Sequence, residues 1–235
     1  MKRIGIIGAM EKEIMQLRER VPDAKIINKA SMKFYQGKMF DHEIIIVKSG
    51  IGKVNASICT QVLIDLFQVD IVINTGIAGS LDNEIEIGDI VISTETMQYD
   101  LDLRELGYAL GQVPGLDNVA FKASPTISEL AHKLCKEVNA DISVFLGRIA
   151  SGDQFVADPI LKGEINKNFN ALCVEMEGAA IGQTAYLNNI PFVIIRSISD
   201  KADNGAKLDF SIFENESAIR SSRLVEKLIE KFVEC

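Results

Sequence analysis

Three apolar runs of this chain are continuous, and each ends abruptly in carboxylates. Residues 5–10 lead into Glu11 and Glu13, residues 172–174 lead into Glu175 and Glu177, and residues 192–199 lead into Asp200. Continuous runs rich in Val and Ile are typical of strands buried on both faces of a parallel sheet, and ligands bind such sheets beyond the carboxyl ends of the strands. The sequence therefore predicts that these acids converge on one pocket.

Length and composition fit one α/β domain over residues 1–235. The 235 residues are 47% hydrophobic, which suffices for one large core. Strand and helix patterns alternate without a repeat, a low-complexity tract or a linker. Strands are expected over residues 3–7, 33–38, 43–49, 71–74, 89–96, 144–149 and 192–198, and helices over residues 11–20, 127–138, 178–188 and 217–233, with one more after Gly52. Residues 99–121 form the longest irregular segment, and loops of that length are often functional.

Charge limits the partners that this chain can have. The formal net charge is -8 and no run is rich in Lys or Arg, which argues against nucleic acid or an anionic membrane surface as the partner. A small neutral or cationic ligand fits better. No signal peptide is recognisable, and no apolar run approaches the roughly 18 residues of a membrane span, so we expect a soluble, cytoplasmic protein.

The cysteines and histidines predict no metal centre and no histidine chemistry. The four cysteines are widely spaced, form no Cys-x-x-Cys pair and are expected to be reduced, packed thiols: Cys59, Cys135, Cys173 and Cys235. His42 falls in an expected turn and His132 on an expected helix. Neither lies beside a candidate nucleophile, so both are expected at the surface.

Each acid group also has an interpretation without function. Glu11 and Glu13, or Glu175 and Glu177, could be first-turn helix acids that interact with the helix dipole. Asp200 could be a helix cap or a turn residue. The arginine in the last run, Arg196, is harder to explain in this way, because a guanidinium inside an apolar strand needs a carboxylate partner. The acids at neighbouring strand ends are its natural partners.

Six motifs in order resemble those of the 5′-methylthioadenosine/S-adenosylhomocysteine nucleosidases over nearly the whole chain. They are GIIGAMExE at residues 5–13, KSGIGKV at 48–54, NTGxAG at 74–79, SGD at 151–153, VEME at 174–177 and RxxSD at 196–200. The resemblance implies a three-layer α/β/α sandwich with a mixed, mostly parallel sheet of the nucleoside phosphorylase type. It also implies a homodimer in which the loop around residues 103–114 completes the neighbour's pocket, and neither a cofactor nor a metal.

The resemblance further implies hydrolysis of the N-glycosidic bond of 5′-substituted adenosines, as in methionine salvage. Asp200 matches the acid that protonates adenine, help that is worth roughly 10²- to 10⁴-fold. Glu13 matches the group that orients and deprotonates water, aided by Glu175 and Arg196. Ser199, beside the acid, completes the implied catalytic set.

The implied binding residues surround adenine, ribose and the thioether tail. Phe155 would stack on adenine and the backbone of Val156 would bind its amino edge, while Met176 and Glu177 would hold the ribose. The apolar slot for the tail would comprise Met10, Ile51 and Phe210, with Leu103, Leu106 and Pro114 from a partner chain. Ala9, Ile77, Ala78 and Gly79 complete the implied set.

Three alternatives remain at this point. A nucleoside phosphorylase on the same fold would need cations where the attacking group binds, and this chain places Glu11 and Glu13 there. A nucleoside-binding protein without turnover would not need so many acids. A divalent metal site held by carboxylates would need a fuller set of ligands than the sequence offers.

Overall fold

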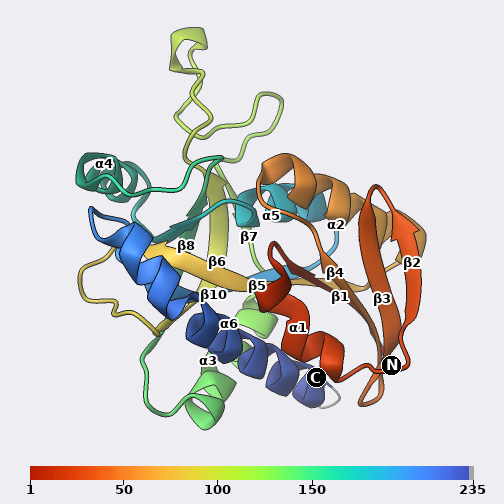
Figure 1. The fold of residues 1–235 in the computed structure, drawn as a ribbon. Coiled ribbons are helices and arrows are strands. Elements are labelled where there is room, and N and C mark those ends of the chain that lie inside the picture. The colour runs from red at the N-terminus through yellow and green to blue at the C-terminus, as the bar shows by residue number, and fades with distance from the viewer. Residues whose placement is uncertain (233–235) are drawn as a thin grey trace.

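The structure is built on one large mixed β-sheet (Figure 1). It is a computed structural model that describes residues 1–232, and in this part of the chain the sheet has ten strands. The strands are β1 (Arg3–Gly8), β2 (Lys25–Lys29), β3 (Met32–Met39), β4 (His42–Lys48), β5 (Ile71–Ser80), β6 (Ile90–Gln98), β7 (Ala120–Lys122), β8 (Val144–Ser151), β9 (Ala171–Glu175) and β10 (Phe192–Asp200). Their order is β10-β6-β8-β9-β5-β1-β4-β3-β2, with β7 beside β6.

One pairing closes part of the sheet on itself. Strand β10 pairs with β6 and also with β5, so that β10, β6, β8, β9 and β5 form a closed ring. Strand β4 pairs with β1, β1 pairs with β5, and β5 pairs with β10, and all three pairings are parallel. The carboxyl ends of β1, β5 and β10 therefore meet at one edge, as the apolar runs predict.

Helices cover both faces of this sheet (Figure 1). They are α1 (Glu11–Glu19), α2 (Lys53–Phe67), α3 (Pro125–Val138), α4 (Pro159–Phe169), α5 (Gly178–Leu187) and α6 (Ala206–Lys231), with a 3₁₀ turn η1 (Arg104–Leu106). Strand β4 shows why two layers are needed. Its Ile44 and Ile46 pack toward α1, α3 and α6, whereas Ile45 and Val47 pack toward α2 and α5. The alternation of side chains along a strand thus buries a continuous apolar run on both faces.

The predicted α/β/α fold is confirmed, and the strands and helices expected from periodicity are present. The expectation missed β2, β7 and α4, and it began α6 at residue 217 instead of Ala206. Strand β2 is mostly exposed, and between residues 206 and 216 only Ala206 of α6 is buried, so these segments carry little apolar periodicity. The last expected helical residue, Val233, lies outside the described residues.

Two smaller expectations had different outcomes. Cys59, Cys135 and Cys173 are free and buried, as predicted, while Cys235 lies outside the described residues. His42 is buried, so its expected surface position is wrong; its Nδ1 accepts a hydrogen bond from the backbone N–H of Lys2 at 3.1 Å, and Phe232 packs against its ring. Within residues 1–232 no helix has the length and apolar character needed to cross a lipid bilayer.

Candidate functional site

A cavity of about 300 Å³ opens beyond the carboxyl ends of β1, β5, β9 and β10. Its lining residues are Ala9, Met10, Glu13, Ile51, Ile77, Ala78, Gly79, Phe155, Val174, Glu175, Met176, Glu177, Ser199, Asp200 and Phe210. All of these except Val174 were expected at the site from the sequence. The acids of the three apolar runs therefore converge, with one exception: Glu11 turns outward and pairs with Arg18 and Lys48.

Three backbone N–H groups hold the carboxylate of Glu13. It occupies the third position of α1, directly after the end of β1. One carboxylate oxygen accepts from Ala9 at 2.7 Å and from Met10 at 2.9 Å, and the other accepts from Ile77 at 3.1 Å. Burial raises the pKa of Glu13, while the positive charge of Arg196 and these hydrogen bonds oppose the rise. The position of Glu13 is thus fixed. Burial favours its protonated form, and Arg196 favours its ionised form.

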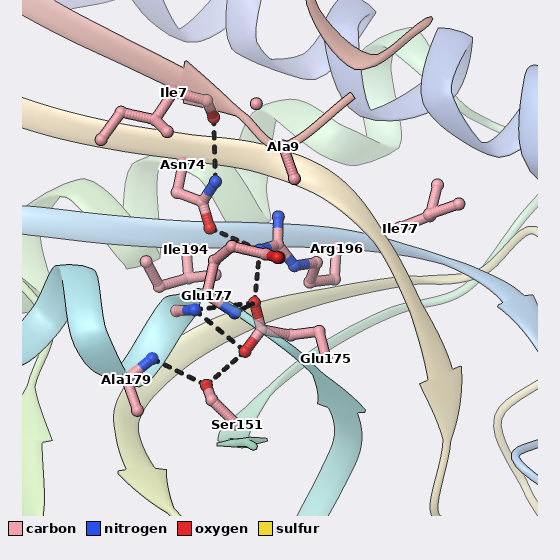
Figure 2. A network of polar contacts seen from close by, with 12 residues as sticks. Ile7, Ala9, Asn74, Ile77, Ser151, Glu175, Glu177, Ala179, Ile194 and Arg196 are labelled. Carbon is pink, nitrogen blue, oxygen red and sulfur yellow. Dashed lines mark hydrogen bonds and ion pairs between the residues drawn. The ribbon is translucent and has the colours of Figure 1, made fainter. Parts of the chain in front are cut away.

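Arg196 lies behind the floor of the cavity with only 1% of its surface exposed. Its Nη2 donates to Asn74 and to Glu175, and lies 3.6 Å from a carboxylate oxygen of Glu177 (Figure 2). Nε and Nη1 have no hydrogen-bond partner in the described part of the chain. The positive charge of one guanidinium therefore acts on several buried carboxylates and offsets the repulsion among them.

Glu175 and Glu177 leave β9 and begin α5. The carboxylate of Glu175 accepts from the backbone N–H groups of Gly178 at 2.7 Å and Glu177 at 3.1 Å, and from the hydroxyl of Ser151 (Figure 2). Glu177 accepts from the N–H of Gly52 at 2.8 Å. Burial, with the neighbouring charge of Glu175, raises the pKa of Glu177 to about 8. The two carboxylates thus differ: both oxygens of Glu175 accept hydrogen bonds, whereas Glu177 accepts one hydrogen bond and its other oxygen has only the ion pair with Arg196 at 3.6 Å.

Asp200 closes the opposite side of the floor at the end of β10. One of its oxygens accepts from the N–H of Ala202 at 2.9 Å and the other from the hydroxyl of Ser199 at 2.9 Å. Burial raises the pKa of Asp200, against the lowering effect of these two hydrogen bonds. A Cβ at Gly79 would lie 2.7 Å from the Asp200 carboxylate, so a glycine is needed for this close approach. A buried carboxyl with a raised pKa is suited to donate a proton.

The mouth of the cavity is apolar and open. Phe155 is 45% exposed and meets Phe210 edge to face, with ring centroids 5.7 Å apart. Ile51 on the opposite rim is 53% exposed. Val156, also predicted for the site, lies in a small adjoining cavity of about 40 Å³ that shares Phe155 and Asp200 with the main one. A flat aromatic ligand group could therefore enter between the rim and Asp200.

The predicted partner residues do not reach this cavity from their own chain. Leu103, Leu106 and Pro114 belong to the long segment between β6 and β7, which Figure 1 shows in yellow-green, projecting from the body of the molecule. Leu106 is 72% exposed at the η1 turn. Their position leaves them free to contact another molecule.

Sequence reasoning quoted three further residues in motifs but gave them no role. Ser151 donates to Glu175 and accepts from the N–H of Ala179 at 2.7 Å, Asn74 contacts Arg196, and the N–H of Gly52 meets Glu177. A small polar residue inside an otherwise apolar strand is the signal that could have singled out Asn74 and Ser151, because buried polar groups are normally paired.

Comparison with known proteins assigns the family. The family model of the phosphorylase superfamily matches residues 3–230. A 5′-methylthioadenosine/S-adenosylhomocysteine nucleosidase of Staphylococcus aureus is 42% identical over 229 residues, covering 97% of this chain and 99% of that protein. This chain belongs to the same family.

Solved structures of the nucleosidase family agree with this assignment. The Neisseria meningitidis enzyme in complex with methylthio-immucillin-A has a TM-score of 0.94 and 39% identity, and the match covers 99% of this chain and 100% of that one. The Colwellia psychrerythraea enzyme in complex with adenine has a TM-score of 0.93 and 40% identity, over 97% of this chain and 95% of that one. The nucleosidase fold is thus shared along the whole described chain.

Proposed function

We propose that this protein hydrolyses the N-glycosidic bond of 5′-methylthioadenosine, S-adenosylhomocysteine and related 5′-substituted adenosines, releasing adenine and the 5′-thioribose. The observation that carries the proposal is the floor of the cavity, where Glu13, Glu175, Glu177 and Asp200 meet. No lysine or arginine lines this cavity within residues 1–232. A floor of carboxyl groups without a facing cation disfavours phosphate as the attacking group, and its ionised carboxylates stabilise the positive charge that grows on the sugar as the bond breaks.

Asp200 supplies the proton in this reaction. Adenine is a poor leaving group until a nitrogen of its imidazole ring is protonated, and the burial that raises the pKa of Asp200 favours the protonated carboxyl, which is the form that can donate. The hydroxyl of Ser199 donates to one oxygen of Asp200 and the N–H of Ala202 donates to the other, so the carboxyl is held in place at the cavity. Phe155 stacks on the adenine ring, and the backbone of Val156 contacts its amino edge.

Glu13 positions and deprotonates the attacking water. Two backbone N–H groups hold one of its oxygens, and the N–H of Ile77 and the charge of Arg196 act on the other side. Water that loses its proton to Glu13 attacks the sugar carbon from which adenine departs. Glu177, which lines the cavity, binds the ribose hydroxyls, and Met176 packs on the sugar.

We further propose that two copies of this chain form a dimer in the cytoplasm. Exposed apolar side chains on α2, Val54 and Ile58, continue the apolar rim at Ile51. The projecting segment offers Leu103, Leu106 and Pro114 to cover the same rim of a second copy. Such cover would complete the apolar slot for the 5′-thio group.

The test is incubation of the protein with 5′-methylthioadenosine in phosphate-free buffer. Hydrolysis predicts free adenine and free methylthioribose at equal amounts. Formation of a sugar 1-phosphate that depends on added phosphate would instead identify a phosphorylase. Binding of the nucleoside without any product would identify a binding protein.

A further inference from the structure

Asn74 is a buried asparagine inside β5, the strand between β1 and β10. Neither its side chain nor its backbone lines the cavity, yet the side chain lies between two parts of the site (Figure 2). Its oxygen accepts from Nη2 of Arg196, and its nitrogen donates to the carbonyl of Ile7 in β1 at 2.9 Å. A polar side chain with no surface exposure and two partners calls for a specific explanation.

The chemistry of the two partners fixes the orientation of the carboxamide. A guanidinium has only donors and a backbone carbonyl has only acceptors, so the amide oxygen must face Arg196 and the NH₂ must face Ile7. Aspartate would lose the donor, and leucine would lose both groups. Glutamine would add a methylene to a fully buried position. Among residues of this size, asparagine alone satisfies both partners.

The first end of Asn74 fixes Arg196. Glu175 accepts from the same Nη2, and Glu175 is itself held by Ser151 and Gly178. A Cβ placed on Gly76 would lie 2.6 Å from Nη1 of Arg196 and 2.5 Å from a carboxylate oxygen of Glu13. Nη1 and Glu13 are therefore neighbours across Gly76. With Nη2 held from two sides, the unpaired end of the guanidinium faces Glu13.

The second end of Asn74 fixes the segment that holds Glu13. Ile7 is the last residue but one of β1, and Ala9, two residues on, donates its N–H to Glu13. One carboxamide thus joins the strand that carries Arg196 to the segment that carries two of the three hydrogen-bond donors of Glu13, Ala9 and Met10. Displacement of either end changes the distance between the guanidinium and the carboxylate.

We propose that Asn74 is a positioning residue that sets Arg196 and Glu13 relative to one another for activation of water. This inference rests on the proposed function. Since Asn74 does not touch the cavity, its removal changes the rate of the bond-breaking and water-attack steps and leaves substrate affinity close to native. Misplacement of reacting groups by about 1 Å lowers rates by about 10²-fold, and this is the loss in kcat that we expect.

The experiment compares adenine release from 5′-methylthioadenosine by the native protein, N74A and the isosteric N74D. We expect kcat to fall by about 10²-fold in N74A, with KM near the native value. The acid limb of its pH profile should also move to higher pH, because a displaced Arg196 opposes protonation of Glu13 less. N139A, which removes another buried asparagine at the end of α3, serves as the control and should keep native kcat.

The outcomes separate the inference from the function on which it rests. A native protein that releases no adenine overturns the proposed function. An active native protein, together with folded N74A at native kcat or with an unmoved acid limb, overturns the role of Asn74. A loss confined to KM or to thermal stability does the same. If N74A does not fold, N74D decides by the same kcat and KM measurements.

Discussion

The floor and the mouth of the cavity are built in different ways. The floor, comprising Glu13, Glu175, Glu177 and Asp200, lies at or just beyond the ends of paired strands, and backbone N–H groups hold every one of these carboxylates. The mouth, comprising Ile51, Phe155 and Phe210, lies on loops and on the exposed start of α6. The floor is complete within one chain, whereas the mouth has apolar surface left to cover.

This difference predicts where substitutions act. Floor residues are fixed where charge develops during the reaction, so their loss should lower kcat. Mouth residues contribute apolar contact area, so their loss should raise KM. Substitutions at floor and mouth residues test whether this division holds.

Asp200→Asn should lower kcat by about 10³-fold, because an amide keeps the shape of the carboxyl and delivers no proton. Affinity for 5′-methylthioadenosine should stay near native. Single-turnover adenine release and direct titration of the ligand measure the two quantities. Asp203→Asn, in the loop that follows, is the matched control. Native turnover in Asp200→Asn would remove this residue from the role of acid.

Glu13→Gln should lower kcat by about 10²-fold or more, because the attacking water loses its base. The fold should persist, since glutamine is nearly isosteric and is accepted at a helix start. Glu11→Gln, two residues earlier and exposed, should keep the native rate. The assay is adenine release with and without phosphate. Rescue of Glu13→Gln by phosphate would show that the nucleophile is assigned wrongly.

Phe155→Ala tests the mouth. Stacking of a base on an aromatic ring contributes about 1–3 kcal/mol, so KM should rise by about tenfold or more while kcat changes less. Steady-state kinetics with 5′-methylthioadenosine provide both values. Phe40→Ala, at an exposed turn between β3 and β4, controls for the general loss of an aromatic ring. If Phe155→Ala lowered kcat alone, the division between floor and mouth would fail here.

Leu106→Ser tests whether a second chain covers the mouth. Removal of one apolar contact should raise KM for a 5′-thio substrate by a few-fold. Substrates without the 5′-thio group should be affected less. Ile160→Ser, equally exposed on α4, should have no effect. Sedimentation of the native protein completes the test, and a fully active monomer would rule out a shared pocket.

Glu177→Gln should have the smallest effect, which is on the pH dependence of stability. It measures how much burial of the ionised Glu177 carboxylate destabilises the folded protein. Because the folded pKa of Glu177 is about 8 against an ordinary value of 4.5, the folded state keeps a proton that the unfolded state releases between these values. The free energy of unfolding therefore falls as the pH rises from about 4.5 to about 8. The fall in Tm between these two pH values should be a few degrees smaller in Glu177→Gln than in the native protein. Glu84→Gln should show the same fall as the native protein. Equal slopes in all three proteins would contradict the raised pKa.

Much of the fold could be predicted because several strands have a recognisable sequence pattern. The runs at β1, β4, β5 and β10 are continuous and apolar, and burial on both faces leaves them no other stable place. The exposed edge strand β2 and the first turns of α6 lack such a pattern, because solvent accepts many residue types. His42 was misplaced for a related reason: the contacts that bury it come from Lys2 and Phe232, far away in the sequence.

The sequence alone predicts that acids follow buried strands and that the ends of these strands bring the acids together. For β1 and β10 this follows from the geometry of parallel strands, whereas β9, which carries Glu175, pairs with β5 in the antiparallel sense. Only the tertiary structure decided which acids face the cavity: Glu13 turns inward to backbone donors, and Glu11, two residues away on the same helix, turns outward to Arg18. It also decided that Asn74 holds Arg196, because this contact joins residues more than a hundred positions apart in the chain.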